Sequence, residues 1–565
     1  MTLAIPTRPS LLRIDRRALV RVGAAALFLA AVAYLVLVPL IRLQAKAFTK
    51  GDGYSEAFSR PGVWDTIRYT VGLALGSVVI ALVLGTLLAW AASRLPRRAR
   101  FLALVPIFPI VVPAIASVVG WAFLLAPGPG YLNALLRHLP WWSDLNRGPV
   151  NVYSLPWIVI ITGFGLTSFV YLFVRSAFAN ISSDYLEAAQ VSGSSGPGVF
   201  FRVTLPLLRP ALIYGGGVAL LLGLGQFTAP LLLGTNQGIT VLTTDMYNQV
   251  ESTPVHYGMA AALGSPLLLF GIAIVALQKV LLGDERRFVT HGGRGFRSGG
   301  KPSRLAAVGI VFYGLIATAL PLIGLVIVAL SRFWSNKIVP SKFTLDNFRT
   351  IFDAPTTTEA IRHSLTYSFI AVAIALPVGF IAASIIIRGR HYPAVGRLLD
   401  FIVALPLGVP SVLFGIGFLL AYSQSPLVLY GTQWVMILVY VTLMLPFATR
   451  MLLAALLSLG ETYREASRIS GAGALTTNVR IVLPLMRSSL GGAAALMFVL
   501  LTHEFTASVL VRSLHTQVMG TVLFDYWGNG GYPLVAAVAL IMAGVTTVGV
   551  IVALLIGGPE SFGSL

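Results

Sequence analysis

Repeated apolar runs, each long enough to cross a lipid bilayer, dominate this chain. A transmembrane helix needs about 20 consecutive, mostly apolar residues, and roughly twelve segments of the chain satisfy that requirement. They lie near residues 20–43, 66–92, 101–125, 154–178, 211–233, 259–282, 305–330, 363–387, 398–422, 432–456, 488–511 and 534–557. These runs predict an all-α, polytopic membrane protein with about 12 transmembrane helices.

The composition agrees with a membrane protein. Of the 565 residues, 56% are hydrophobic and 11% are charged, which is too little charge to cover a soluble protein of this size. The absence of cysteine excludes disulfides, thiolate metal sites and cysteine nucleophiles. A net charge of +20 would suggest nucleic-acid binding in a soluble chain, but the basic residues flank apolar runs. We therefore expect a lipid bilayer, and no nucleic acid, among its partners.

The basic loops predict the orientation. With a cytoplasmic N-terminus, five segments rich in Arg or Lys fall on the cytoplasmic side: 93–100, 180–210, 283–304, 388–397 and 459–487. The loops 234–258 and 513–533 carry no Lys or Arg and fall outside, whereas the outer loops 44–62 and 332–362 carry some. The first apolar run exceeds the 7–15 residues of a signal-peptide core, so we expect it to be retained. Both termini are then cytoplasmic.

The two halves of the chain repeat one another. We predict a first domain at 1–282, a linker at 283–304 and a second domain at 305–565. Each half places six spans in the same orientation, so the repeat is parallel and suits a pseudo-two-fold axis along the membrane normal. The linker is rich in Gly and Arg, which favours a flexible cytoplasmic connection. A phosphate-binding loop is the alternative, but the segment lacks a Gly-Lys-Ser/Thr ending.

The most informative part of the repeat is a pair of cytoplasmic loops, 182–209 and 459–487. At a constant offset they align Glu187, Ala188, Ala189, Gly193, Leu205 and Pro206 with Glu465, Ala466, Ser467, Gly471, Leu483 and Pro484. Each loop suits two short helices, with the glycine in the left-handed conformation and the proline at the start of the next rigid segment. Such an amphipathic loop can dock into a groove of a soluble partner or lie on the membrane surface.

This pattern resembles the Glu-Ala-Ala motif of permeases of ATP-binding-cassette (ABC) importers. The first loop matches every position of the motif, and the second departs once, with Ser467 in place of the second Ala. The resemblance covers nearly the whole chain, because each half is similar to one permease domain. It implies the type I ABC importer permease fold, with two parallel six-helix repeats fused into one chain, in a bacterial inner (plasma) membrane.

The resemblance also implies partners. Glu187 and Glu465 would lie at the contacts with two copies of an ABC ATPase subunit, and a substrate-binding protein would dock at the outer face. ATP and Mg²⁺ would be bound by the partner subunit, so we expect no cofactor, no metal site and no catalytic residues in this chain. The sequence contains no Walker A motif. A secondary transporter of the major facilitator type, which also has twelve spans in two parallel repeats, is the competing class.

Three polar residues stand inside apolar runs. His503 and Glu504 lie near the middle of the predicted span 488–511, and Gln226 is the equivalent of Glu504 in the first half. A charge at that depth costs at least about 2.5 kcal/mol and usually faces a cavity or a partner. We expect Gln226, His503 and Glu504 either to line the translocation path or its gate, or to form a buried hydrogen bond between helices that holds the halves together.

The substrate is suggested by resemblance alone. Two fused halves of this length, residues 128–133 after the third span, and residues 227–230 followed by 241–244 resemble ferric-iron importers. Iron(III) is therefore the expected substrate, with thiamine or a polyamine as the alternative.

Overall fold

A computed structural model of the chain describes residues 16–181, 183–282, 303–387 and 393–557. Within these ranges the chain forms helices joined by loops, and no β-strand occurs among them. This confirms the predicted all-α class. The predicted linker 283–304 lies almost entirely outside the described residues, so the domain boundaries there stay predictions.

The first half contributes thirteen α-helices within the described residues: α1 (Arg16–Lys46), α2 (Tyr54–Ser59), α3 (Val63–Ser93), α4 (Phe108–Val111), α5 (Ala114–Leu125), α6 (Tyr131–Leu136), α7 (Leu155–Asn180), α8 (Ser183–Val191), α9 (Gly196–Val199), α10 (Leu205–Leu207), α11 (Arg209–Leu224), α12 (Leu242–Glu251) and α13 (Tyr257–Leu282). A 3₁₀ segment at Arg97–Ile107 leads into α4.

The second half follows a similar order, with its first span divided by a π-helical turn at Leu315–Ala319 and with no counterpart of α6 between α19 and α20. Its helices are α14 (Arg304–Gly314), α15 (Leu320–Leu330), α16 (Asp346–Asp353), α17 (Pro355–Ile387), α18 (Pro393–Gly408), α19 (Ser411–Tyr422), α20 (Gln433–Leu459), α21 (Thr462–Ile469), α22 (Ala474–Thr477), α23 (Leu483–Leu485), α24 (Arg487–Thr502), α25 (Ser508–Val511), α26 (Met519–Gly528) and α27 (Tyr532–Gly557).

The spans number eight straight helices, or up to twelve when four sharply bent pairs are each counted as one span, among the described residues. The third span of each half breaks at a proline: the bend is 92° before α5, where Pro113 stands, and 110° before α19, where Pro410 stands. Proline ends a helix because it lacks an N–H group and its ring clashes with the preceding turn. The upper count matches the predicted number of spans.

The fifth spans differ from the prediction. The sequence predicts continuous helices at 211–233 and 488–511, but α11 ends at Leu224 and α24 ends at Thr502. A polar side chain competes for the backbone at each break: Gln226 Oε1 accepts the N–H of Phe227, and Glu504 accepts N–H groups at the start of α25. His503 and Glu504 therefore follow the end of α24 and do not lie inside a continuous helix.

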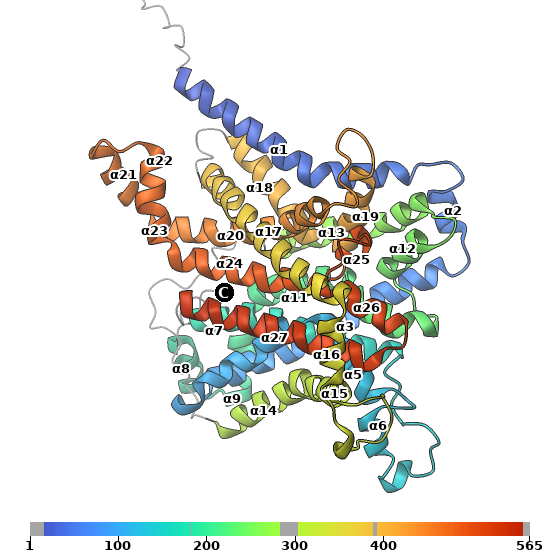
Figure 1. The fold of residues 1–565 in the computed structure, drawn as a ribbon. Helices are drawn as coiled ribbons and strands as arrows, with labels where there is room; N and C mark the ends of the chain where they lie inside the picture. The colour runs from blue at the N-terminus through green and yellow to red at the C-terminus, as the bar shows by residue number, and fades with distance from the viewer. Residues whose placement is uncertain (1–15, 182, 283–302, 388–392, 558–565) are drawn as a thin grey trace, which may run out of the picture.

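The first span of each half crosses to the other half. Helix α1 packs against α18 and α19, and helix α15 packs against α5, while each also contacts the sixth span of its own half, α13 or α27 (Figure 1). Two glycines permit these crossings. A Cβ built on Gly417 would lie 2.8 Å from the carbonyl oxygen of Pro39, and one on Gly120 would clash with the carbonyl oxygen of Pro321. The two halves are thus interlocked.

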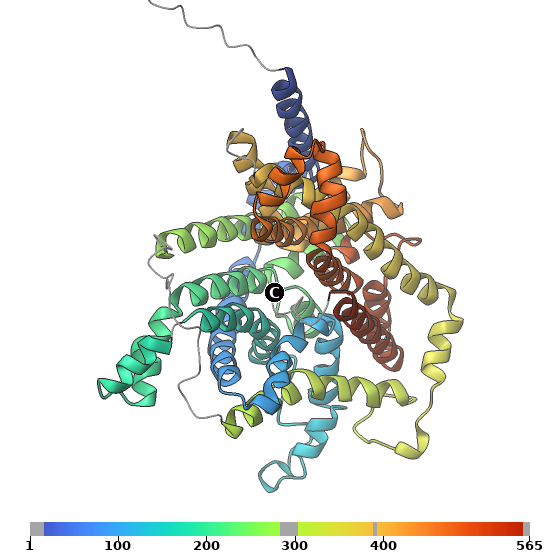
Figure 2. The same cartoon turned by 90° about the vertical axis from the view of Figure 1, so that its left-hand side faces the viewer.

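The two predicted loops lie at the same end of the molecule. In Figure 1, α8 and α9 of the first loop and α21 and α22 of the second are all at the left-hand side. Figure 2 looks onto that side and shows the two loops at well-separated places. The loops with α2, α6 and α12, which the sequence predicts to be outer, lie toward the opposite end (Figure 1). This arrangement agrees with a parallel repeat.

Candidate coupling loops and translocation path

The two loops have the same local structure. In the first, α8 is followed by Gly193 at φ +84°, then α9, a π-helical turn at Phe200–Thr204 and α10. In the second, α21 is followed by Gly471 at φ +79°, then α22, a π-helical turn at Asn478–Val482 and α23. Glycine is favoured at these two turns because a Cβ would strain a left-handed backbone. Pro206 and Pro484 lie in the first turns of α10 and α23.

Most of the motif residues face solvent. Glu187, Ala188, Gly193, Pro206, Glu465, Ala466, Gly471 and Pro484 are exposed, Ala189, Leu205 and Leu483 are half-buried, and Ser467 is buried. Large apolar side chains are exposed beside them at equivalent positions. Val191 and Ile469 are 89% and 88% exposed, and Tyr185 and Tyr463 are also exposed. Exposed apolar side chains gathered beside acidic ones are typical of a surface that another molecule covers.

The structure explains the one departure from the motif. Ser467 Oγ lies 2.8 Å from Thr477 Oγ1, and both side chains are buried between α21 and α22. In the first half the equivalent positions hold Ala189 and Val199, which carry no hydroxyl group. The second half therefore replaces an apolar pair by a hydrogen-bonded pair, so the buried hydroxyl of Ser467 has a partner.

The first loop also has an anchor that the second lacks. The ring of Phe200 packs edge-on against Trp90 near the end of α3, with 5.7 Å between centroids, and the Arg94 guanidinium lies 4.2 Å from the centre of the Trp90 ring. The equivalent positions in the second half are Ser384 and Asn478, which have no aromatic ring. The aromatic contact of Phe200 with Trp90 holds the first loop against α3, and the cation–π contact of Arg94 with Trp90 lies within the end of α3 itself.

Glu504 is held within its own half. Its carboxylate accepts the N–H groups of Ala507 at 2.8 Å and Ser508 at 3.0 Å, and the Ser508 hydroxyl at 2.6 Å. The Ser508 hydroxyl also lies 2.8 Å from the hydroxyl of Tyr440 on α20. A half-buried carboxylate within the membrane is tolerated when hydrogen-bond donors surround it in this way. These hydrogen bonds tie α25 to α20 and do not reach the first half.

Gln226 has a similar local role, while His503 does not. The amide Nε2 of Gln226 donates to Thr162 Oγ1 at 3.4 Å, and the backbone oxygen of Gln226 accepts from Thr243 Oγ1 at 2.6 Å. His503 is half-buried, and its Nδ1 atom has no hydrogen-bond partner among the described residues. The structure places the three residues at equivalent breaks of the fifth spans, without a direct hydrogen bond joining the two halves there.

Aromatic residues beside these positions do meet across the halves. The rings of Phe227 and Phe505, each directly after Gln226 or Glu504, have centroids 5.8 Å apart. Tyr247 lies 5.6 Å from Phe227, Phe524 lies 5.5 Å from Phe505, and Tyr247 and Phe524 are 6.2 Å apart. We call these four residues the aromatic ring. Its signal in the sequence is the repeated Phe-Thr-Ala that follows Gln226 and Glu504.

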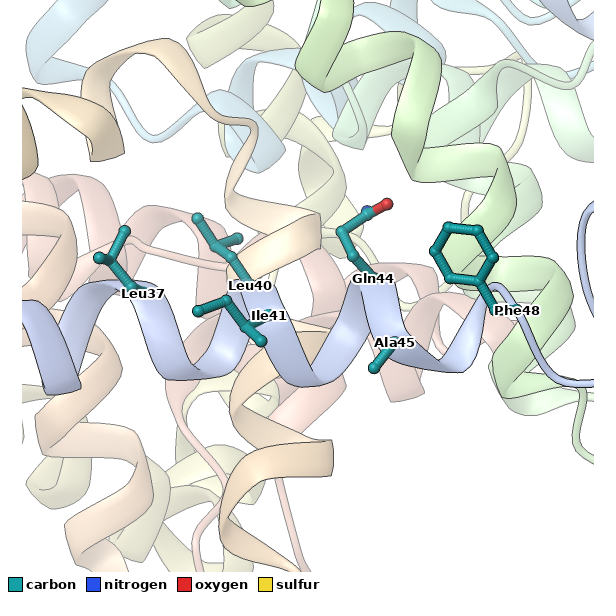
Figure 3. A pocket seen from close by; sticks show the side chains of 6 residues that line it. All are labelled: Leu37, Leu40, Ile41, Gln44, Ala45 and Phe48. Carbon is teal, nitrogen blue, oxygen red and sulfur yellow. The ribbon is translucent and has the colours of Figure 1, made fainter.

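A shallow recess lies on α1 and the turn that follows it. It has a volume of about 490 Å³ and is lined by Leu37, Leu40, Ile41, Gln44, Ala45 and Phe48. Figure 3 shows these side chains along one stretch of the helix. Gln44 is its one polar residue, and its Oε1 atom accepts a hydrogen bond from Ser265 at 2.8 Å. The lining is typical of a surface that contacts lipid chains. No group of three or more possible metal-binding residues occurs in the described part of the chain.

These features define an inner-membrane permease with two equivalent halves. The chain belongs to the family described as binding-protein-dependent transport system inner membrane component, which matches residues 72–286 and again residues 375–558. Both halves therefore carry the same permease domain, and the chain is a multi-pass permease of a bacterial ABC importer. Members of this family are transport components and not catalysts.

Individual relatives differ in the solute that their names give. The chain is 26% identical to the ferric transport system permease protein FbpB of Actinobacillus pleuropneumoniae, over 82% of this chain and 67% of that protein. It is 31% identical to the sulfate transport system permease protein CysW of Escherichia coli, over 43% of this chain and 81% of that protein. One solved structure, a bacterial alginate ABC transporter with an alginate-bound periplasmic protein, aligns at 20% identity with a TM-score of 0.39, over 49% of this chain and 97% of that chain.

Proposed function

We propose that this chain forms the translocation path of an ATP-driven importer for iron(III), which a binding protein delivers. The observation that carries the proposal is the pair of matching loops, both exposed and both at one end of the molecule. Similarity to a ferric transport permease over most of the chain supports iron(III) as the solute.

Two copies of an ABC ATPase subunit would dock on the loops, one on each. Glu187 and Glu465 are exposed on α8 and α21 beside the exposed apolar residues Val191 and Ile469. An apolar surface with an acidic rim suits a groove of a soluble partner. ATP and Mg²⁺ would bind only in that partner, and this chain would hydrolyse nothing itself.

The proposed docking of the ATPase subunits on the two loops also determines the orientation of the chain in the membrane. The loops lie on the cytoplasmic side, so both termini are cytoplasmic, and the opposite end receives the binding protein. The loops continue through Pro206 and Pro484 into α11 and α24, and Gln226, His503 and Glu504 follow the far ends of these helices. A loop moved by its ATPase would therefore move the end of a fifth span, and Gln226, His503 and Glu504 would line the path or its gate.

Sulfate is a second candidate solute, because the sulfate permease relative is 31% identical over 43% of this chain. Thiamine and polyamines remain alternatives from the sequence. The permease would be reconstituted with its ATPase, and ATP hydrolysis measured with the binding protein loaded in turn with iron(III), thiamine, spermidine or sulfate. Stimulation by the iron(III)-loaded protein is expected; stimulation by another loaded form alone would replace iron(III) with that solute.

A further inference from the structure

We propose that the aromatic ring of Phe227, Tyr247, Phe505 and Phe524 is the gate that closes the translocation path at the end away from the coupling loops. The proposal rests on the proposed import function, because a gate presupposes a path through the chain. It assigns gating to four aromatic side chains, and not to their polar neighbours Gln226, His503 and Glu504.

The position of the ring suits an outer gate. Helices α11 and α24 start directly after the two loops and each runs for 16 residues, which is about 24 Å at the usual rise of an α-helix. Phe227 and Phe505 follow the ends of these helices. The ring is thus separated from the loops by most of the thickness of a bilayer's hydrocarbon core.

The ring obeys the repeat. Phe227 and Phe505 differ by 278 positions, as the two loops do, and Tyr247 and Phe524 differ by 277. Matching contacts fix this second alignment: the N–H of Leu242 donates to Thr70 at 2.8 Å, and the N–H of Met519 donates to Ser364 at 2.9 Å. Two equivalent pairs that meet each other must surround the pseudo-two-fold axis, which is where a path between the two halves would run.

The ring contacts fall into two kinds. Phe227–Tyr247 and Phe505–Phe524 lie within one half, whereas Phe227–Phe505 and Tyr247–Phe524 join the halves. The pairs within a half are reinforced. Thr243 on α12 donates to the backbone oxygen of Gln226, and Gly520 on α26 packs so closely that an added Cβ would lie 3.2 Å from Cβ of Phe505. No hydrogen bond among those described joins one side of the ring to the other.

We call the two contacts that join the halves, Phe227–Phe505 and Tyr247–Phe524, the seam of the aromatic ring. If the halves rock apart, the two contacts between halves separate while each half keeps its own aromatic pair, and no hydrogen bond is broken at the seam. In the closed ring Phe227, Phe505 and Tyr247 are 1%, 3% and 7% exposed, and Phe524 is half-buried, so the ring excludes water over most of its lining. A hydrated ion does not pass through such an apolar constriction, because it would lose its water without gaining a polar partner.

Cysteine pairs test the seam directly, because the chain has no cysteine of its own. One variant carries Phe227→Cys with Phe505→Cys, across the seam, and its matched control carries Phe505→Cys with Phe524→Cys, within one half. Each is reconstituted with the ATPase, closed with a short thiol cross-linker, and assayed for binding-protein-dependent uptake before and after reduction. We expect the cross-seam link to lower uptake at least tenfold and reduction to restore it, whereas the control link leaves uptake within about twofold.

Equal uptake with and without the cross-seam link, or equal inhibition by both links, would contradict the proposal that the aromatic ring is a gate. Failure of the wild-type chain to support ATP-dependent uptake would instead refute the proposed function, so the two failures are distinguishable. A second readout does not need transport by the double variants. Single-cysteine Phe505→Cys is expected to react with a membrane-impermeant maleimide only when ATP holds the ATPases closed, and equal labelling with and without ATP would also contradict the gate.

Discussion

Glu504 shows how a single half-buried carboxylate can set the shape of a span. Its three hydrogen bonds, to Ala507 and Ser508, start α25 and end the continuous helix that the apolar sequence predicts. The spacing of apolar residues indicates where a helix can lie, but it gives no sign of a side chain that accepts backbone N–H groups and so ends the helix. The sequence therefore located the polar residues of the fifth span and missed the break that they make.

We predict that Glu504→Ala destabilises the permease more than Glu504→Gln does. Alanine leaves the N–H groups of Ala507 and Ser508 without their acceptor, and hydrogen bonds to a charged group contribute about 1.5–3 kcal/mol each. Glutamine keeps one acceptor oxygen. Thermal unfolding in detergent, measured with uptake in proteoliposomes, checks this. Normal stability of Glu504→Ala with lost uptake would contradict the capping role and favour a direct role in the path.

Ser467 illustrates what a motif comparison alone leaves unexplained. In the sequence it is a departure from the pattern, and only the structure shows its partner, Thr477, ten residues later. The spacing of the motif was visible because both copies share one offset. The compensating hydroxyl of Thr477 was not visible in the same way, because position 477 lies outside the motif.

At the scale of elements, the loops depend on a left-handed turn. We predict that Gly471→Ala weakens retention of the ATPase, because alanine at φ +79° costs about 1–2 kcal/mol and reorients α22 relative to α21. Gly473→Ala is the matched control, since Gly473 has φ −72° and open space around its Cα. Co-purification of the ATPase checks this: equal retention by both variants would contradict the importance of the turn.

The crossing of the first spans is a second property of elements. The Cβ in Gly417→Ala would meet the backbone of Pro39, which cannot move without shifting α1, so we expect overpacking to cost at least about 1–3 kcal/mol. Gly408→Ala, in the same broken span, meets no atom within 4 Å and serves as the control. Protease resistance of the purified chain is the measurement. Comparable protease resistance of the two variants would show that α1 can move away from α19 at this contact without destabilising the chain.

At the scale of the molecule, the crossing makes the halves interdependent. The repeat predicted two domains, and sequence similarity between halves says nothing about which helices pack together. Because α1 lies on α18 and α19 while α15 lies on α5, each half alone would expose an unpaired third span. The structure was therefore needed to find that the halves interlock, whereas the number of spans and the position of the loops could be predicted from the sequence.

We predict that a chain divided within 283–304 assembles when both pieces are expressed together. Each piece expressed alone is expected to aggregate or be degraded, since the surface that its partner's first span covers is left open. Size-exclusion chromatography of the separate and combined pieces measures this. A single half that runs as a monodisperse monomer would contradict the interlocked arrangement.

The proposed function requires that ATP hydrolysis in a partner, acting through the two loops, drives import through this chain. The most direct measurement is uptake of radioactive iron(III) into proteoliposomes that hold the permease and its ATPase, with the loaded binding protein outside. We expect uptake that requires both ATP and the binding protein and that persists when ion gradients are collapsed. Uptake driven by an ion gradient alone, without the ATPase, would contradict it and indicate a secondary transporter.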